Sequence, residues 1–207
     1  TINFNDTLTK EYLLSVIAAG NLKQFHYVLD VLSKMLTAPE NRAQRMYILK
    51  SILQGTGKSS FCGLLRALMG KRYVTFHTSL DRVFSDFNIV NAFKLVIFVD
   101  DVTSASKSQT RKLFPLATQA STIVNQKGMR PLEVDEYSNL FLTGNDKNVL
   151  YVSAEDRRQV ILTVGTGKKG NRQFFDRLYE EFENQDVMKA VYGYLVNRDT
   201  TKFSLHD

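Results

Sequence analysis

A short stretch rich in glycine and hydroxyl residues has the composition of a phosphate-binding loop. It separates an apolar run at 46–49 from an amphipathic run at 61–69, and its residues are Gln54, Gly55, Thr56, Gly57, Lys58, Ser59 and Ser60. Glycines let the backbone curl until several N–H groups point at one anion, and a following helix adds its own unpaired N–H groups. A lysine and a serine at the end of such a loop hold phosphates and Mg²⁺. We therefore predict a nucleotide site, with Lys58 on the β- and γ-phosphates and Ser59 on the metal.

The match to the full phosphate-loop pattern lacks one residue. That pattern has a glycine five residues before Gly57, where this chain has Ile52. The motif is therefore GxGKS between a predicted strand and a predicted helix. A glycine-rich turn with an exposed lysine is the alternative interpretation.

Two carboxylates follow an apolar stretch, 95–99, whose β-branched residues are typical of a strand buried on both faces. At the carboxyl end of a central parallel strand, acidic groups lie beside the phosphate loop. We predict that Asp100 holds Mg²⁺ through water and that Asp101 orients or deprotonates an attacking water. A helix cap or a turn is the alternative, because Asp is common after any strand.

An amide follows the next buried strand, 139–143, in the stretch Gly144-Asn145-Asp146. We predict that the Asn145 amide contacts the attacking water or the γ-phosphate from the side opposite Asp101. An Asn-Asp turn is the alternative, since such turns often end strands.

Basic residues lie at two further places. Arg157 and Arg158 precede a predicted strand at 159–164, and a rigid guanidinium fork at this edge suits a γ-phosphate held by a neighbouring subunit. Adjacent arginines are more often surface charges. A predicted hairpin at 121–134 carries Lys127 and Arg130 near its tip, where they would contact a nucleic-acid backbone or remain solvated charges.

The elements that must position these residues fall into three segments. Residues 1–45 have the periodicity of helices, 46–164 alternate strand and helix, and 165–207 contain two more helices after a glycine- and lysine-rich linker. The alternation predicts an α/β fold with three α/β/α layers and a mostly parallel sheet, and the glycine loop within it indicates the P-loop NTPase type. The aromatic stripe that includes Phe174 and Phe175 is predicted to be core packing.

The composition limits which further sites and partners we expect. The chain has 207 residues, 43% hydrophobic residues, one cysteine, three scattered histidines and a net charge of +6. It therefore lacks an internal disulfide and suggests no histidine metal site. The basic balance modestly favours a polyanionic partner. No apolar run approaches the roughly 20 residues of a membrane span, and no leader suggests secretion.

Taken in order, the motifs resemble those of the superfamily 3 helicases, within the AAA+ class of ATPases. The likeness is strongest to the ATPase domain of primase-helicases of phages, plasmids and large DNA viruses, including the poxvirus type. The residues that carry it span about half the chain and are Gln54–Ser59, Phe87-Asn88, Leu95–Asp101, Lys127-Gly128, Thr143–Asn145 and Asp156–Arg158.

This resemblance implies a ring, usually a hexamer, that binds ATP and Mg²⁺ between subunits. It implies that Asn145 is the polar sensor and that Arg157 or Arg158 is the arginine finger. The hairpin with Lys127 would grip single-stranded DNA, or RNA, in the central pore. Many relatives have Glu where this chain has Asp101.

The leading functional hypothesis is an ATP-driven single-strand translocase that acts as a replicative DNA helicase, at a cytoplasmic or nuclear site of replication. A P-loop small-molecule kinase is one alternative, because this length would accommodate it. A non-catalytic nucleic-acid-binding module with a decayed loop is another, because Ile52 departs from the pattern.

Overall fold

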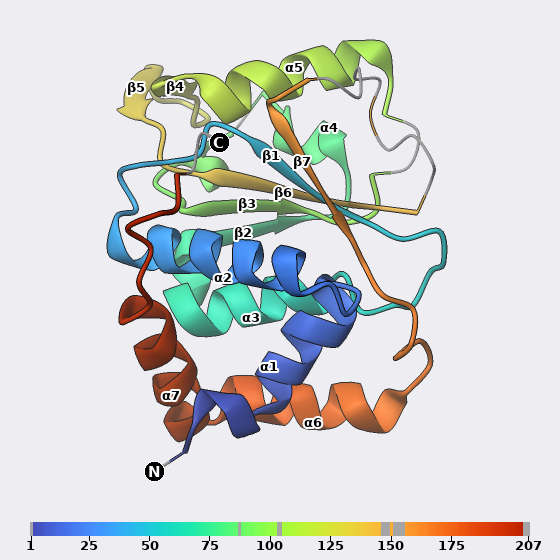
Figure 1. Cartoon of the computed structure of the whole chain (residues 1–207). Helices are drawn as coiled ribbons and strands as arrows, with labels where there is room; N and C mark the ends of the chain where they lie inside the picture. The colour runs from blue at the N-terminus through green and yellow to red at the C-terminus, as the bar shows by residue number, and fades with distance from the viewer. Residues whose placement is uncertain (1, 87, 103–104, 146–149, 151–155, 205–207) are drawn as a thin grey trace.

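The computed structural model describes residues 2–86, 88–102, 105–145, 150 and 156–204. Its centre is a five-stranded sheet in the order β2-β3-β6-β1-β7, and every neighbouring pair of strands is parallel (Figure 1). The strands are β1 Met46–Lys50, β2 Val74–His77, β3 Val96–Val99, β6 Asn139–Gly144 and β7 Gln159–Thr163. The predicted α/β class with a mostly parallel sheet is confirmed.

Helices cover both faces of this sheet (Figure 1). One face packs against α4 (Leu80–Val83) and α5 (Lys107–Thr118), and the other packs against α2 (Leu22–Thr37) and α3 (Ser60–Met69). Each of the three longer helices places its apolar residues on one side, which is the pattern that a sheet-covering helix needs.

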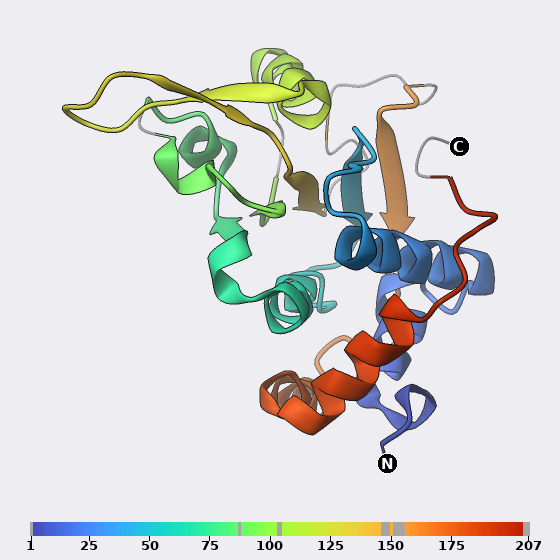
Figure 2. The same cartoon turned by 90° about the vertical axis from the view of Figure 1, so that its left-hand side faces the viewer.

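The helices near the two ends of the chain form a further layer beneath α2 and α3 (Figures 1 and 2). Its elements are η1 Phe4–Asp6, α1 Leu8–Tyr12, η2 Leu13–Ile17, α6 Arg172–Glu183 and α7 Gln185–Val196, while η3 Lys71–Tyr73 and η4 Ile89–Asn91 lie in the connections of the sheet. One continuous apolar core joins Leu13, Phe61 and Val191, which come from all three segments of the sequence. None of the described helices has the length and apolar character that would let it span a membrane.

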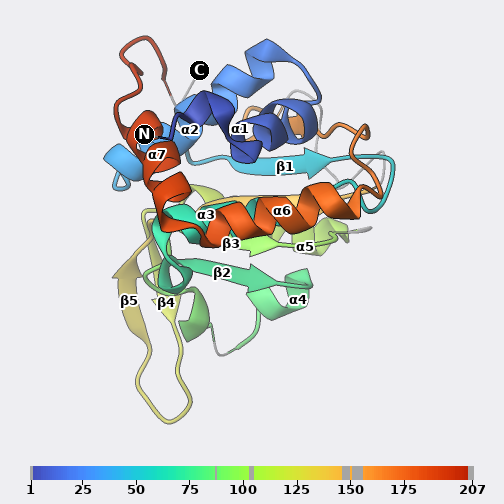
Figure 3. The ribbon, with the colours of Figure 1, turned by 90° about the horizontal axis from the view of Figure 1, so that it is seen from below.

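The predicted hairpin is confirmed as a separate antiparallel pair, β4 (Ser121–Val124) and β5 (Leu132–Asp135). It projects away from the body of the molecule (Figures 2 and 3). Asn88 pins its first strand, because the side-chain amide donates to the Ile123 carbonyl at 2.9 Å and accepts from the Asn125 N–H at 2.8 Å. Phe87, which precedes Asn88 in the Phe87-Asn88 motif, lies outside the described residues.

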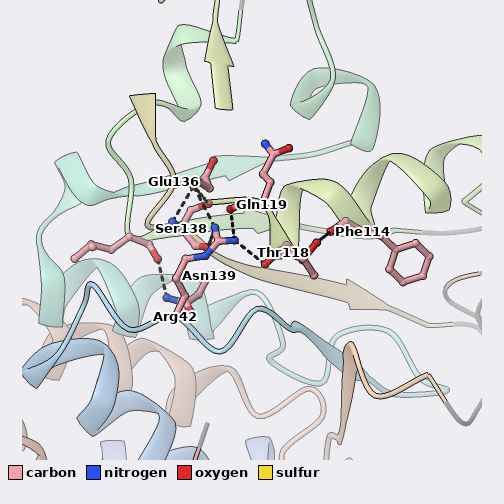
Figure 4. Close-up of polar contacts among 9 residues, drawn as sticks. Arg42, Phe114, Thr118, Gln119, Glu136, Ser138 and Asn139 are labelled. Atoms are coloured by element: carbon pink, nitrogen blue, oxygen red, sulfur yellow. Dashed lines mark hydrogen bonds and ion pairs between the residues drawn. The ribbon is translucent and has the colours of Figure 1, made fainter. Parts of the chain in front are cut away.

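A buried arginine fixes the base of the hairpin (Figure 4). Arg42 donates to the Ser138 carbonyl at 3.1 Å and to the carbonyls of Ala117 and Gln119 at 2.7 and 2.9 Å. Glu136 lies 3.6 Å from the same guanidinium and accepts hydrogen bonds from the Ser138 N–H and hydroxyl. Arg42 therefore ties the carboxyl end of α5 to the connection between β5 and β6.

Replacement of Arg42 tests this anchor. Both side chains of the Arg42–Glu136 pair are more than nine-tenths buried, so Arg42→Met leaves a buried carboxylate without its partner. We expect the free energy of unfolding to fall by about 3 kcal/mol in urea titrations. Arg172→Met is the matched control: its pair with Asp176 is exposed, so the change should stay below about 0.5 kcal/mol. Equal losses in the two variants would contradict the assigned anchor.

Candidate phosphate-binding site

The glycine loop, the two aspartates and Asn145 meet at one edge of the sheet. The loop follows β1, the aspartates follow β3, and Asn145 follows β6, which lies between them. Because parallel strands end at the same edge, these groups surround one cavity of about 420 Å³, within the range of small-molecule sites. The described residues that line it are Gln54, Gly55, Thr56, Gly57, Lys58, Ser59, Ser60, Asp100, Asp101, Thr143, Asn145 and Phe175.

The backbone of the loop explains which glycines are present. Gly55 and Gly57 have φ values of 69° and 94°, in the region that favours glycine. At Gly57 a Cβ would also collide with the Phe175 ring. Ile52, in contrast, is not among the residues with positive φ, so this loop does not require a glycine at that position. The residue that departs from the pattern is therefore compatible with the loop.

Lys58 points across the cavity toward the neighbouring strand. Its Nζ donates to Asn145 Oδ1 at 2.6 Å and also contacts the Leu53 carbonyl and the Thr56 hydroxyl, at 3.3 and 3.4 Å. Burial lowers the pKa of Lys58 from its ordinary value, because the ammonium loses water, while Asp100 and Asp101 act in the opposite direction. These three hydrogen-bond partners are neutral oxygens, so among the described residues no carboxylate forms a direct ion pair with the ammonium.

Ser59, the residue after Lys58, contacts Asp100. The Ser59 hydroxyl is 2.8 Å from both oxygens of the Asp100 carboxylate, and Asp100 also accepts from the Thr143 hydroxyl at 2.7 Å. A hydroxyl and a carboxylate in contact are the protein donors that Mg²⁺ uses when phosphates and waters complete its shell. Among the described residues, no group of three or more His, Cys, Asp or Glu side chains could hold a metal. The donor set therefore fits Mg²⁺ bound with phosphate, not a metal held by protein ligands alone.

Asp101 is held in a left-handed conformation, with φ of 54°. Its N–H donates to the Thr143 hydroxyl at 2.8 Å, and the next N–H, of Val102, donates to the Thr143 carbonyl at 2.7 Å. The Asn145 amide donates to Asp101 Oδ1 at 3.2 Å. Asn145 thus lies in contact with Asp101, as the adjacency of β6 and β3 allows, and its contact with a γ-phosphate or water from the side opposite Asp101 stays a prediction. Asp146 lies outside the described residues.

Arg157 and Arg158 lie at the opposite edge of the sheet from this cavity. Arg158 directly precedes β7, and its carbonyl accepts from the Met46 N–H at the start of β1. The five residues of β1 correspond to about 16 Å between the two edges. The guanidinium of Arg158 is paired with Asp156 at 2.6 Å and lies over the Phe114 ring at 3.8 Å. Arg157 is exposed and makes no hydrogen bond or ion pair with the described part of the chain.

Lys127 and Arg130 are also far from the cavity lining. Both are exposed at the end of the hairpin, beyond the paired residues of β4 and β5. Gly128 has φ of 77°, which allows the tight reversal between them. The structure therefore presents two cations on a projecting element, as the sequence suggested.

Two contacts to the loop were not predicted. The Tyr12 hydroxyl, in α1, donates to the Gly57 carbonyl at 2.8 Å, and Phe175, in α6, lines the cavity beside the same residue. Burial raises the pKa of Tyr12, which keeps the hydroxyl a neutral donor. Both residues belong to periodic apolar faces that resemble core packing, so their types and spacing carry no separate signal of the loop.

Comparisons with known proteins identify a family and a shared fold. The model of a family described as "Family of unknown function (DUF5906)" matches residues 49–158, which run from the end of β1 to the start of β7 and make up more than half of the chain. The chain belongs to this family. No curated protein sequence matches significantly.

Solved structures resemble the whole chain at low sequence identity. An apo structure of the NrS-1 C-terminal region has a TM-score of 0.78 and 20% identity, and covers 93% of this chain and 45% of that one. A second apo structure of that region gives 0.77 and 19%, with 92% and 45% covered. A structure of JCV helicase bound to a small molecule gives 0.55 and 14%, with 96% and 58% covered. The fold is thus shared with a helicase, and this chain spans less than two thirds of each of those chains.

Proposed function

We propose that this chain is the ATPase core of a superfamily 3 helicase of the primase-helicase type, which moves along single-stranded DNA at the expense of ATP. The observation that carries the proposal is the convergence of Lys58, Ser59, Asp100, Asp101 and Asn145 on one cavity beside a glycine loop. Its fold, shared with a JCV helicase structure, supports the same assignment.

Each side chain has a role that follows from its contacts. Lys58 would bind the β- and γ-phosphates in place of Asn145, its present partner, and the α3 N-terminus would add unpaired N–H groups. Ser59 and Asp100 would hold Mg²⁺, which neutralises charge on the phosphates. Asp101 would accept a proton from the attacking water, and the Asn145 amide, already on its carboxylate, would orient both.

The strand order favours hydrolysis over transfer to a small acceptor. Because β6 lies between β1 and β3, Asn145 occupies the space between the lysine and the acids, where it can position a water. The kinase alternative assigns no role to this amide. The alternative of a decayed loop rested on Ile52, whose backbone is compatible with the loop.

The position of the arginines supports an assembly in which subunits complete one another's sites. Since about 16 Å of strand separates them from the cavity of their own chain, Arg157 and Arg158 could reach a triphosphate only on a second copy. Arg158 is held by Asp156 and Phe114, which leaves Arg157 as the guanidinium of the pair that is free of hydrogen bonds and ion pairs to the described residues. We assign Arg157 as the arginine finger and Arg158 as the residue that positions it, in a ring that is a hexamer.

The hairpin is the element that would move DNA. Its second strand, β5, continues through Glu136, Ser138 and β6 to Asn145, so one short stretch of chain joins the hairpin to the ATP site. A change at Asn145 on hydrolysis would be transmitted through β6 to the base of the hairpin, where Arg42 holds the connection. Subunits that act in turn would then draw the strand through the pore.

Complementation between two inactive variants tests the shared site. Arg157→Ala and Lys58→Ala should each reduce ATP hydrolysis at least a hundredfold, because each removes charge stabilisation of the transition state. An equal mixture of the two should regain about a quarter of the wild-type rate, since about one interface in four then combines an intact lysine with an intact arginine. Phosphate release is the measurement, and Arg158→Ala, which keeps the free guanidinium, should retain more activity than Arg157→Ala.

Absence of any gain on mixing would contradict the trans assignment. A wild-type rate per chain that does not change with protein concentration or with added single-stranded DNA would count against the ring. Hydrolysis that persists in Lys58→Ala would place the ATP site elsewhere.

Replacement of Lys127 tests the nucleic-acid half of the proposal. Lys127→Ala should weaken binding of single-stranded DNA and lower the slope of log affinity against log salt by about 0.7, as loss of one phosphate contact predicts. Basal ATP hydrolysis should not change, because the hairpin tip lies far from the cavity lining. Lys23→Ala, which removes an exposed lysine from α2, is the matched control. Loss of ATP binding in Lys127→Ala would refute this division of roles.

A further inference from the structure

Among the described residues that line the cavity, Phe175 alone comes from neither the loop nor a strand end. Its neighbours on α6, Phe174 and Leu178, are buried in the core, whereas Phe175 is only half-buried and faces the cavity. Its ring lies against Gly57, where no side chain could be added. Phe175 also packs in part against that core, but unlike Phe174 and Leu178 it places an aromatic ring at the rim of a polar cavity.

The ring face of Phe175 has no stacked partner in the described chain. Its one aromatic neighbour there is Phe174, at 5.3 Å between centroids and 84° between planes, which is an edge contact. Phe175 is also the only aromatic residue among the described residues that line the cavity. A flat, apolar ligand group entering the cavity would therefore find one surface on which to stack.

The cavity has a polar end and an apolar wall. Lys58, Asp100 and Asn145 gather at the polar end, where charged and amide groups suit phosphate oxygens, a cation and water. Phe175 lies on the Gly57 side of the loop, together with Tyr179 one turn further along α6, whose hydroxyl is 2.8 Å from Ser60 Oγ. A ligand with a polyanionic end and a flat aromatic end matches this division.

We infer that Phe175 is the stacking platform for the nucleobase of the bound nucleoside triphosphate, an inference that rests on the proposed ATP site. A ring face stacks on any base and reads none of the base edges. The site should accordingly prefer purines to pyrimidines, because purines stack over a larger area, and should distinguish ATP from GTP only weakly.

Binding of two ligands that share phosphates but differ in the base tests the inference. Titrations of the full chain with Mg·ATP and with Mg·tripolyphosphate would compare Phe175→Ala, Phe175→Leu and Phe175→Tyr with wild type. Phe175→Leu keeps an apolar group against Gly57 but lacks a ring face. We expect the Ala and Leu variants to weaken ATP binding about tenfold and tripolyphosphate binding less than twofold, and the Tyr variant to bind both as wild type does. Tyr192→Ala, which removes an exposed ring from α7, is the control.

Equal weakening of both ligands would overturn the inference and make Phe175 a support of the loop. Unchanged ATP binding in Phe175→Leu would overturn it as well. Wild-type protein that binds tripolyphosphate as tightly as ATP would refute the base contact while leaving the phosphate site intact. Wild-type protein that binds neither ligand would refute the proposed function itself.

Discussion

Three neighbouring parallel strands, β1, β6 and β3, end at one edge of the sheet, and the site depends on this constraint. Thr143, the next-to-last residue of β6, enforces it with hydrogen bonds to both aspartates after β3: its hydroxyl donates to the Asp100 carboxylate and accepts the Asp101 N–H. Lys58, in the loop that follows β1, donates a hydrogen bond to Asn145, which directly follows β6. Thr143 and Asn145, at the end of β6, therefore hold Lys58 and both aspartates around one small cavity. None of these three groups is positioned only by the strand that precedes it.

The site is contacted by the terminal helices and is connected through β6 to the hairpin. Tyr12 and Phe175, from helices near the two ends of the chain, contact Gly57, so both terminal segments lie against the loop. At the other end of β6, the Arg42–Glu136 cluster fixes the connection to the hairpin. A single strand thus joins a cavity suited to a triphosphate to a basic projection suited to a phosphate backbone. The proposed translocation is a movement of the hairpin relative to the cavity.

Much of the site could be predicted because its signals are local. A glycine loop before a helix, acids after an apolar strand and a basic hairpin tip are patterns that neighbouring residues specify by themselves. What could not be predicted depends on tertiary neighbours. The segment with Arg42 resembles an ordinary polar loop, although its guanidinium is buried among three carbonyls of two other segments. Phe175 shares its periodicity with core residues. The contact between Asn145 and Asp101 follows from strand order, which spacing along the chain does not reveal.

The central claim is that the loop, the aspartates and Asn145 bind one triphosphate together with Mg²⁺. A crystal structure of the full chain with Mg²⁺ and a nonhydrolysable ATP analogue tests it most directly. We expect the γ-phosphate beside the Lys58 ammonium, Mg²⁺ on the Ser59 hydroxyl with Asp100 next to it, and the Asn145 amide facing the γ-phosphate. A nucleotide bound away from the loop, or a triphosphate that leaves Lys58 paired with Asn145 and contacts neither Ser59 nor Asp100, would contradict it.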